Sequence, residues 1–257
     1  MKKILCFVCV TLFIASCMKD SIGLGDTSGT GKGGSMARFA IKGDILYTVS
    51  TDSLKLFNIE YAENPKHAPE RDLRIGFDIE TIFPMDTLLF IGSRNGMYVY
   101  DITEPRFPTL LSEVRHLRSC DPVVAQDNYA YVTLNTNAST CGPNPNNELH
   151  VYDISDPTNP ILKITLRLSG PAGLGIDGTK LFVCDRGLKV FNITNPLNIR
   201  QTDDLVDIDE VNLRSAYDVI PLNGLLLLVA EEGLFQFDYT GDRLKFVSKL
   251  EIKQQAP

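Results

Sequence analysis

Short apolar runs bounded by turn residues recur along the chain after residue 35, and five of them end in the same way. Their sequences are SLKLFNI, GMYVYDI, ELHVYDI, GLKVFNI and GLFQFDY, at residues 53–59, 96–102, 148–154, 187–193 and 233–239. Each run places an aromatic residue directly before an Asn or Asp. Runs of this length, rich in β-branched and aromatic residues, predict strands. The pattern therefore predicts five copies of one β-rich unit.

The residue that ends each run forms a regular column of Asn and Asp. Its members are Asn58, Asp101, Asp153, Asn192 and Asp238, which are 43, 52, 39 and 46 positions apart. Spacings of about 40–50 residues are typical of propeller blades. A side-chain oxygen at the end of a strand can accept hydrogen bonds from the amides of the following turn. We therefore assign this column a structural role in turns.

Each unit divides into four predicted strands. Two β-rich runs separated by Gly, Asp or Asn precede the shared run, and a final run follows it after a turn that usually contains Pro. The shared runs are apolar on both faces, as Leu188, Val190, Phe191 and Ile193 show. Strands with this pattern are buried on both sides. Stacking four-stranded sheets between like neighbours achieves that burial, which predicts an all-β fold, a β-propeller of five four-stranded blades over residues 36–257.

The order of strands also predicts how the ring closes. The first unit begins at its innermost strand and the last unit ends at its outermost strand. Closure then relies on side-chain packing between blades, and no strand is exchanged between the two ends of the chain.

The N-terminus has the pattern of an export signal. Lys2 and Lys3 precede an apolar stretch over residues 4–16 that is too short to span a bilayer as a helix. It ends in Ile-Ala-Ser-Cys at residues 14–17, which resembles the bacterial lipobox, so we predict a lipoprotein signal peptide over residues 1–17 and lipidation at Cys17. Residues 18–35 are rich in Gly and Ser and predict a flexible tether. Met18 in place of Asp favours an outer-membrane or cell-surface location.

Composition narrows the chemistry that the chain can support. The formal net charge is −7, Trp is absent and only three His occur. An acidic chain does not suit nucleic-acid binding, which needs a basic surface. Few His residues leave few metal ligands and general bases, and the sequence contains no familiar catalytic or zinc motif. We expect no cofactor and assign no catalytic and no metal-binding residue.

One mouth of the predicted channel could carry carboxylates. The count takes Phe90, Tyr131 and Leu228 as equivalent second-strand positions and moves ten residues back along the chain. The three acidic residues reached in this way are Glu80, Asp121 and Asp218. They could cap strand starts, hold a ligand or a cation such as Ca²⁺, or act as general acid and base. The acidic run at residues 203–210 lacks EF-hand spacing and predicts a solvated outer strand and loop.

The cysteines of the mature chain predict one disulfide. An export signal sends the chain to an oxidising compartment, where paired cysteines are normally bridged. Cys120 lies at the entrance to the third blade, and Cys141 lies in the loop between the second and third strands of that blade. Both positions are expected on one face of the disc, so we predict a Cys120–Cys141 bridge. Cys184 lies within an apolar strand and is expected to be buried.

The segments MYVYDITEPRFP and LHVYDISDPTNP resemble LVIVD repeats, which occur in cell-surface proteins of bacteria and archaea. The resemblance covers about residues 36–252 and is strong in the three middle repeats. The first repeat departs from the pattern at Glu60 and Tyr61, and the fifth departs at Gln236 and at residues 239–241. These departures are expected to mark an irregular seam of the ring. The resemblance implies a surface location and a propeller fold, and it implies no reaction.

Three functions remain open at this point. The one we favour is a noncatalytic binding or scaffold lipoprotein, anchored to the membrane by its lipid and binding an unidentified protein or glycan. The alternatives are a carbohydrate-active enzyme that uses the channel carboxylates and a structural subunit of an outer-membrane complex. Fold alone does not separate them.

Overall fold

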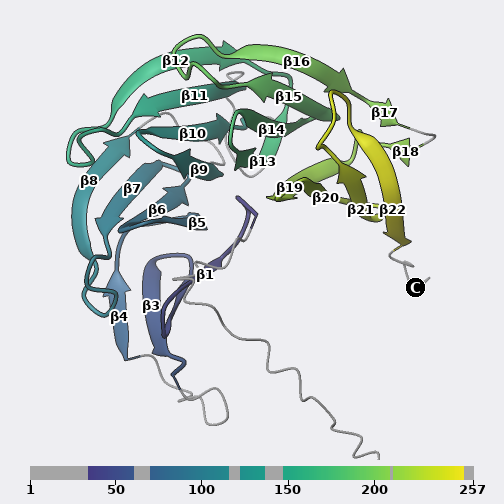
Figure 1. Cartoon of the computed structure of the whole chain (residues 1–257). Helices are drawn as coiled ribbons and strands as arrows, with labels where there is room; N and C mark the ends of the chain where they lie inside the picture. Colours follow the sequence, from purple (N-terminus) through teal and green to yellow (C-terminus); the bar gives the residue numbers. More distant parts are fainter. Residues whose placement is uncertain (1–33, 61–69, 116–121, 137–146, 209–210, 252–257) are drawn as a thin grey trace, which may run out of the picture.

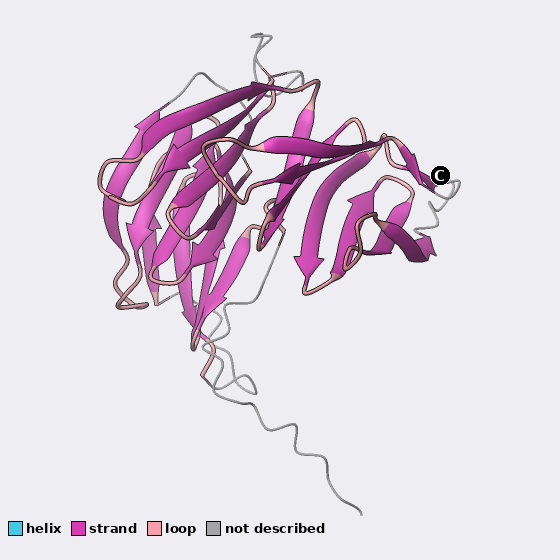
Figure 2. Cartoon of the chain, turned by 45° about the horizontal axis from the view of Figure 1, so that its top comes forward, coloured by secondary structure: helices cyan, strands magenta, loops and turns pink. Residues whose placement is uncertain are grey.

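The computed structural model describes residues 34–60, 70–115, 122–136, 147–208 and 211–251. These residues form five four-stranded antiparallel sheets arranged around a centre as a five-bladed β-propeller (Figure 1). The described residues contain strands and loops without a helix (Figure 2), so none of them supplies a helix that could cross a membrane. The fold class predicted from the repeats is confirmed.

Each blade is a meander whose first strand lies innermost. Blade 1 contains β1 (Phe39–Lys42), β2 (Ile45–Val49), β3 (Ser53–Asn58) and β4 (Arg71–Arg74). Blade 2 contains β5 (Ile79–Met85), β6 (Leu88–Ser93), β7 (Gly96–Asp101) and β8 (Thr109–Arg115). Blade 3 contains β9 (Val123–Gln126), β10 (Tyr129–Leu134), β11 (Glu148–Asp153) and β12 (Ile161–Arg167).

Blade 4 contains β13 (Pro171–Asp177), β14 (Lys180–Asp185), β15 (Leu188–Asn192) and β16 (Arg200–Leu205). Blade 5 contains β19 (Ala216–Leu222), β20 (Leu225–Ala230), β21 (Gly233–Asp238) and β22 (Lys245–Glu251). A two-stranded ribbon of β17 (Asp207–Ile208) and β18 (Val211–Asn212) connects these two blades. The described strands of each blade follow one another along the chain, so among the described residues no strand is exchanged between the first and last blades.

The Asn and Asp column supports the turn after the third strand of each blade. In all five blades its side-chain oxygen accepts a hydrogen bond from the amide two residues later, at 2.7–3.0 Å. The bonded pairs are Asn58–Glu60, Asp101–Thr103, Asp153–Ser155, Asn192–Thr194 and Asp238–Thr240. The amide between them bonds to the hairpin that joins the first two strands, as Ile102 N does to Thr87 O at 2.7 Å. The side chain thus stabilises its own turn, and the main-chain amide that follows it ties this turn to the hairpin of the same blade.

Apolar side chains join the blades in pairs. One buried cluster spans blades 1 and 2, a second spans blades 2 and 3, a third spans blades 3 and 4, and a fourth spans blades 4 and 5. Cys184 is fully buried in the last of these, as expected from its apolar strand. Among the described residues, no apolar cluster contains both blade 5 and blade 1. This junction is called the seam below.

Burial along the second strands shows the same division. In β6, β10 and β14 every residue after the first is buried. In β2 and β20 buried residues alternate with half-buried ones. Side chains alternate between the two faces of a strand. Blades 2–4 are therefore covered on both faces, whereas blades 1 and 5 each have one face that is only partly covered.

Two glycines allow the inner strands of blades 4 and 5 to approach closely. A Cβ added to Gly175 of β13 would lie 2.5 Å from Pro221 Cδ and 2.8 Å from Val219 O. A Cβ added to Gly173 would lie 2.3 Å from a carboxylate oxygen of Asp218. Larger residues would force β19 outward, so these glycines fix the width of the channel on this side.

Candidate functional site

The channel has two ends that differ in structure. The inner strands β5, β9, β13 and β19 begin at one end, which we call the start end, and turn back into second strands at the other, which we call the hairpin end. At the hairpin end lies a cavity of about 280 Å³, formed by the last residues of these four strands. No described residue of blade 1 lines it. The cavity is the candidate functional site.

Polar atoms supply nearly as much of the cavity surface as apolar atoms, although most of the lining residues are apolar. The apolar residues include Phe83, Pro84, Met85, Ala125, Ile176, Ile220 and Pro221. Gln126 is a polar member of the wall, and its amide nitrogen already donates to the main-chain oxygen of Gly178 at 2.8 Å. Packing between blades holds these strands in place, so the cavity is formed before any ligand arrives.

Two carboxylates, those of Asp86 and Asp127, stand at the rim of the cavity. They begin the hairpin turns of blades 2 and 3, with φ values of 49° and 53°, and both side chains are exposed. Asp, Asn and Gly are the residues that tolerate this left-handed backbone. Among the ion pairs of the described residues, none includes either carboxylate. Lys42 of blade 1 donates to the main-chain oxygen of Asp86 at 2.8 Å.

The start half of the channel is filled by the chain itself. Gly34 and Ser35 are buried in the centre of the ring, where the purple segment before β1 lies beside β19 (Figure 1). Ser35 Oγ donates to Asp218 Oδ1 at 3.2 Å and accepts from the Leu174 amide at 2.7 Å. Gly34 and Ser35, the last two residues of the predicted tether, are therefore packed inside the channel, and residues 1–33 with Cys17 lie outside the described part.

Asp218 is an unusual carboxylate because it is buried, with only 7% of its surface exposed. Burial raises the pKa of Asp218 to about 6, and hydrogen bonds from the Val219 amide and from Ser35 and Met36 moderate that rise. Burial disfavours the charged form of a carboxylate, and donors directed at it favour that form. Ser35 and Asp218 thus form a buried polar link between the first and last parts of the folded chain.

The predicted group of Glu80, Asp121 and Asp218 is not brought together as one set in the described structure. Glu80 lies 2.8 Å from Arg94 Nε in an ion pair. Asp121 lies outside the described residues. Asp218 faces Ser35 in the start half of the channel.

The alignment that grouped Asp218 with Glu80 was wrong by one residue. Asp218 pairs with Val229 and Thr81 pairs with Gly92, and both partners are fifth in their second strands. Thr81 is therefore the counterpart of Asp218, while Tyr217 is the counterpart of Glu80 at the bulge. The run of four leucines from Leu225 hides where the second strand begins. A one-residue shift moves a side chain to the other face of its strand.

The other candidate sites have structural explanations or lie outside the described residues. In the described part of the chain, no three His, Cys, Asp or Glu side chains lie close enough to hold a metal ion. The acidic run begins in the outer strand β16, where exposed Asp204 lies 2.5 Å from Lys189 Nζ, and its last two residues are not described. Cys120 and Cys141 also lie outside the described residues, so their disulfide stays a prediction.

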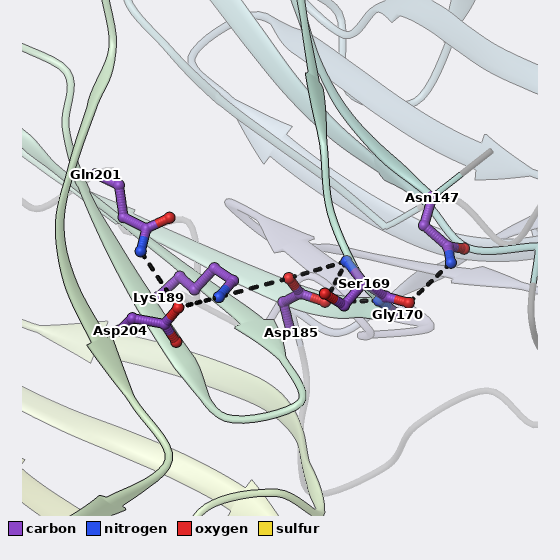
Figure 3. A network of polar contacts seen from close by, with 7 residues as sticks. All are labelled: Asn147, Ser169, Gly170, Asp185, Lys189, Gln201 and Asp204. Carbon is purple, nitrogen blue, oxygen red and sulfur yellow. Dashed lines mark hydrogen bonds and ion pairs between the residues drawn. The ribbon is translucent and has the colours of Figure 1, made fainter.

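A buried carboxylate that the sequence analysis missed holds the chain where it enters blade 4 (Figure 3). Asp185 accepts hydrogen bonds from the amides of Ser169 and Gly170, at 2.9 and 2.6 Å. Lys189 Nζ lies 3.8 Å from it, and Asn147 donates to the Ser169 oxygen at 2.9 Å from blade 3. These contacts link neighbouring blades, which assigns Asp185 a structural role. The sequence signal that could have identified Asp185 is its place at the end of the apolar run KLFVCD.

Comparisons with known proteins support the fold. The LVIVD repeat model matches residues 144–167, which include β11 and β12 of blade 3. No curated protein matches the sequence. Similar solved structures include a functionally unknown protein from Desulfotomaculum acetoxidans DSM 771, with a TM-score of 0.63 and 12% identity over 87% of this chain and 69% of that one.

Two further solved structures are similar at the level of the fold. AztD from Citrobacter koseri has a TM-score of 0.56 and 13% identity over 79% of this chain and 58% of that one. BamB from Moraxella catarrhalis has a TM-score of 0.51 and 11% identity over 89% of this chain and 75% of that one. At these identities the similarity shows fold alone. With the repeat match and the strand topology together, the chain is a five-bladed β-propeller that carries the LVIVD repeat.

Proposed function

We propose that this protein is a membrane-anchored, noncatalytic binding propeller whose ligand enters the cavity at the hairpin end of the channel. The observation that carries the proposal is the contrast between the two halves of the channel. One half is filled by Gly34 and Ser35 of the chain itself, and the other half is a preformed cavity open to a ligand.

The cavity has the character of a binding site for a small group with an apolar and a polar part. Ligand pockets are mostly apolar, with a few polar groups that set orientation. At about 280 Å³, the cavity is just below the usual range for such pockets, so it suits a small molecule or one side chain of a larger partner. The described carboxylates of the enzymatic alternative lie elsewhere, with Glu80 bound to Arg94 and Asp218 bound to Ser35.

The anchor is supported by the N-terminal sequence. The Ile-Ala-Ser-Cys motif follows a 13-residue apolar stretch, over residues 4–16, and the outer membrane or cell surface is the proposed location. Stable anchoring takes more than one acyl chain, which the modification of a lipobox cysteine provides.

A substitution at Cys17 tests the anchor. Replacing it with Ser removes the thiol that would carry the lipid, so Cys17→Ser should leave the membrane fraction or remain unprocessed. Cell fractionation and the intact mass of the product measure both outcomes. A Cys17→Ser protein of mature mass that still sediments with membranes would contradict the anchor and leave the cavity unaffected.

A ligand screen tests the cavity. The full-length protein in detergent is screened against a library of small fragments by the shift of its thermal unfolding temperature. Ile220→Trp and Met85→Trp each add bulk at a half-buried lining residue and should narrow the cavity. Binders of the native protein should lose their effect in both variants. Fragments that stabilise the native protein and both variants equally would show that binding occurs elsewhere.

A further inference from the structure

We propose that the ligand is a protein segment that inserts one lysine or arginine side chain into the cavity, with its apolar stem on the wall and its charge between Asp86 and Asp127. This inference rests on the proposed function and names the chemistry of its ligand. The two rim carboxylates come from neighbouring blades, and both line the cavity.

The wall favours an aliphatic stem over a sugar. A glycan needs many directed hydrogen bonds, whereas the lining offers few polar side chains, namely Asp86, Asp127 and Gln126, and the amide nitrogen of Gln126 is already bonded to Gly178. The side chains of lysine and arginine have four and three methylene groups ahead of their charge. They bury this stem against apolar surface while the charge stays at the edge. The small volume suits one such side chain.

The rim favours a cation. Neither Asp86 nor Asp127 takes part in an ion pair among the described residues, and both side chains are exposed. Lys42, the cation from blade 1, is bonded to the main-chain oxygen of Asp86 at 2.8 Å. The formal net charge of −7 adds long-range attraction for a basic partner.

The turn geometry supplies a clean variant for the test. Asp86 and Asp127 occupy left-handed positions, where Asn is equally tolerated and where Asn223 is found in blade 5 with a φ of 47°. Asp86→Asn with Asp127→Asn therefore removes both charges and keeps the turns. Asp44→Asn is the matched control, because Asp44 is an exposed carboxylate in the hairpin turn of blade 1 that does not line the cavity.

The experiment measures binding of labelled heptapeptides, Gly-Ser-Gly-X-Gly-Ser-Gly, to the full-length protein in detergent by fluorescence anisotropy. The central residue X is lysine, arginine or norleucine, which has a similar stem without the charge. We expect lysine and arginine peptides to bind about tenfold more tightly than the norleucine peptide, as two partly exposed ion pairs allow. The double Asp→Asn variant should abolish that difference, and Asp44→Asn should retain it.

The outcomes separate this inference from the proposed function. Equal binding of lysine and norleucine peptides, or no effect of the double variant, overturns the cationic ligand. If Ile220→Trp and Met85→Trp still abolish binding of all peptides in that case, the cavity remains the binding site. Binding that persists in both tryptophan variants overturns both proposals. The absence of binding by any peptide overturns the cationic ligand, and the fragment screen then decides for the cavity.

Discussion

Blades 2–4 and the two blades at the seam are built from the same repeat, yet they are covered differently. Leu181 of blade 4 and Leu46 of blade 1 occupy the second position of equivalent strands, and Leu181 is fully buried while Leu46 is half-buried. The strand LLLLVA of blade 5 is among the most apolar in the chain and is still buried on one face only. Burial here depends on the neighbouring blade and cannot be read from the hydrophobicity of the strand itself.

The seam is held in a different way from the other junctions. Apolar clusters join blades 1 to 5 in sequence, whereas the part of the seam that lies in the channel is a polar link. Ser35, ahead of blade 1, bonds to Asp218 of blade 5 and to the Leu174 amide of blade 4. A buried polar link contributes only if all its members are bonded. The comparison therefore predicts larger stability losses from apolar truncations within the ring than at the seam.

The largest effect is expected from a matched pair of leucine truncations. Leu181→Ala should lower the free energy of unfolding by about 3 kcal/mol, because it leaves a cavity in a fully buried cluster. Leu46→Ala should lower it by about 1 kcal/mol, because its half-buried site loses less apolar contact. Urea unfolding of both variants measures the difference. Equal losses would show that the seam is packed as tightly as the other junctions.

The next effect concerns the pH dependence of stability. The pKa of Asp218 is raised to about 6 in the fold from 3.8, so between these values the folded state binds more protons than the unfolded state. The contribution of Asp218 to the free energy of unfolding is fully present below pH 3.8. It falls as pH rises to about 6, by at most about 3 kcal/mol.

Asp218→Asn should remove this component of the pH dependence. Unfolding midpoints measured from pH 4 to pH 7 should fall less steeply in the variant than in the native protein. The Glu80→Gln variant is the control, since that carboxylate is paired with Arg94 and lies outside the polar link. Identical slopes for Asp218→Asn and the native protein would show that the carboxylate is not desolvated.

The smallest effect is expected from Ser35→Ala. The substitution removes the hydroxyl that donates to Asp218 and accepts from the Leu174 amide, which should lower stability by about 1 kcal/mol. Ser50→Ala loses only a 3.5 Å contact within its own blade and serves as the reference. Thermal unfolding measures both. A Ser35→Ala protein as stable as the native one would show that the seam does not depend on this link.

Local signals account for what the sequence predicted well. The Asn and Asp column recurs because each blade needs the same turn, and this made the five blades, their strand order and the unexchanged ends predictable. Gln236, a departure in the fifth repeat, lies on the partly covered face of β21, in agreement with the expected irregular seam. The turn residues Asn223 and Gly224 indicate that the second strand of blade 5 begins at Leu225. An alignment of the repeats anchored on this turn would have matched Asp218 with Thr81.

Features that depend on how the five blades are arranged around the channel were not predictable from one repeat. The cavity combines strand ends from four blades, and each contributes ordinary apolar residues such as Ile176 or Ile220. Ser35 lies in a segment whose composition indicates a tether, and its contacts are with residues 139 and 183 positions away. Such sites depend on which residues of different blades the fold brings together, and strand periodicity does not encode this.

The position of Gly34 and Ser35 in the channel has a mechanical consequence. The described part of the chain begins near the axis of the disc, in the half of the channel opposite the cavity. A force applied through the preceding residues acts near that axis and turns the start end toward its source. With the anchor proposed above, tension through residue 34 would align the channel with the direction of pull and present the hairpin end, with Asp86 and Asp127 at its rim, away from the membrane.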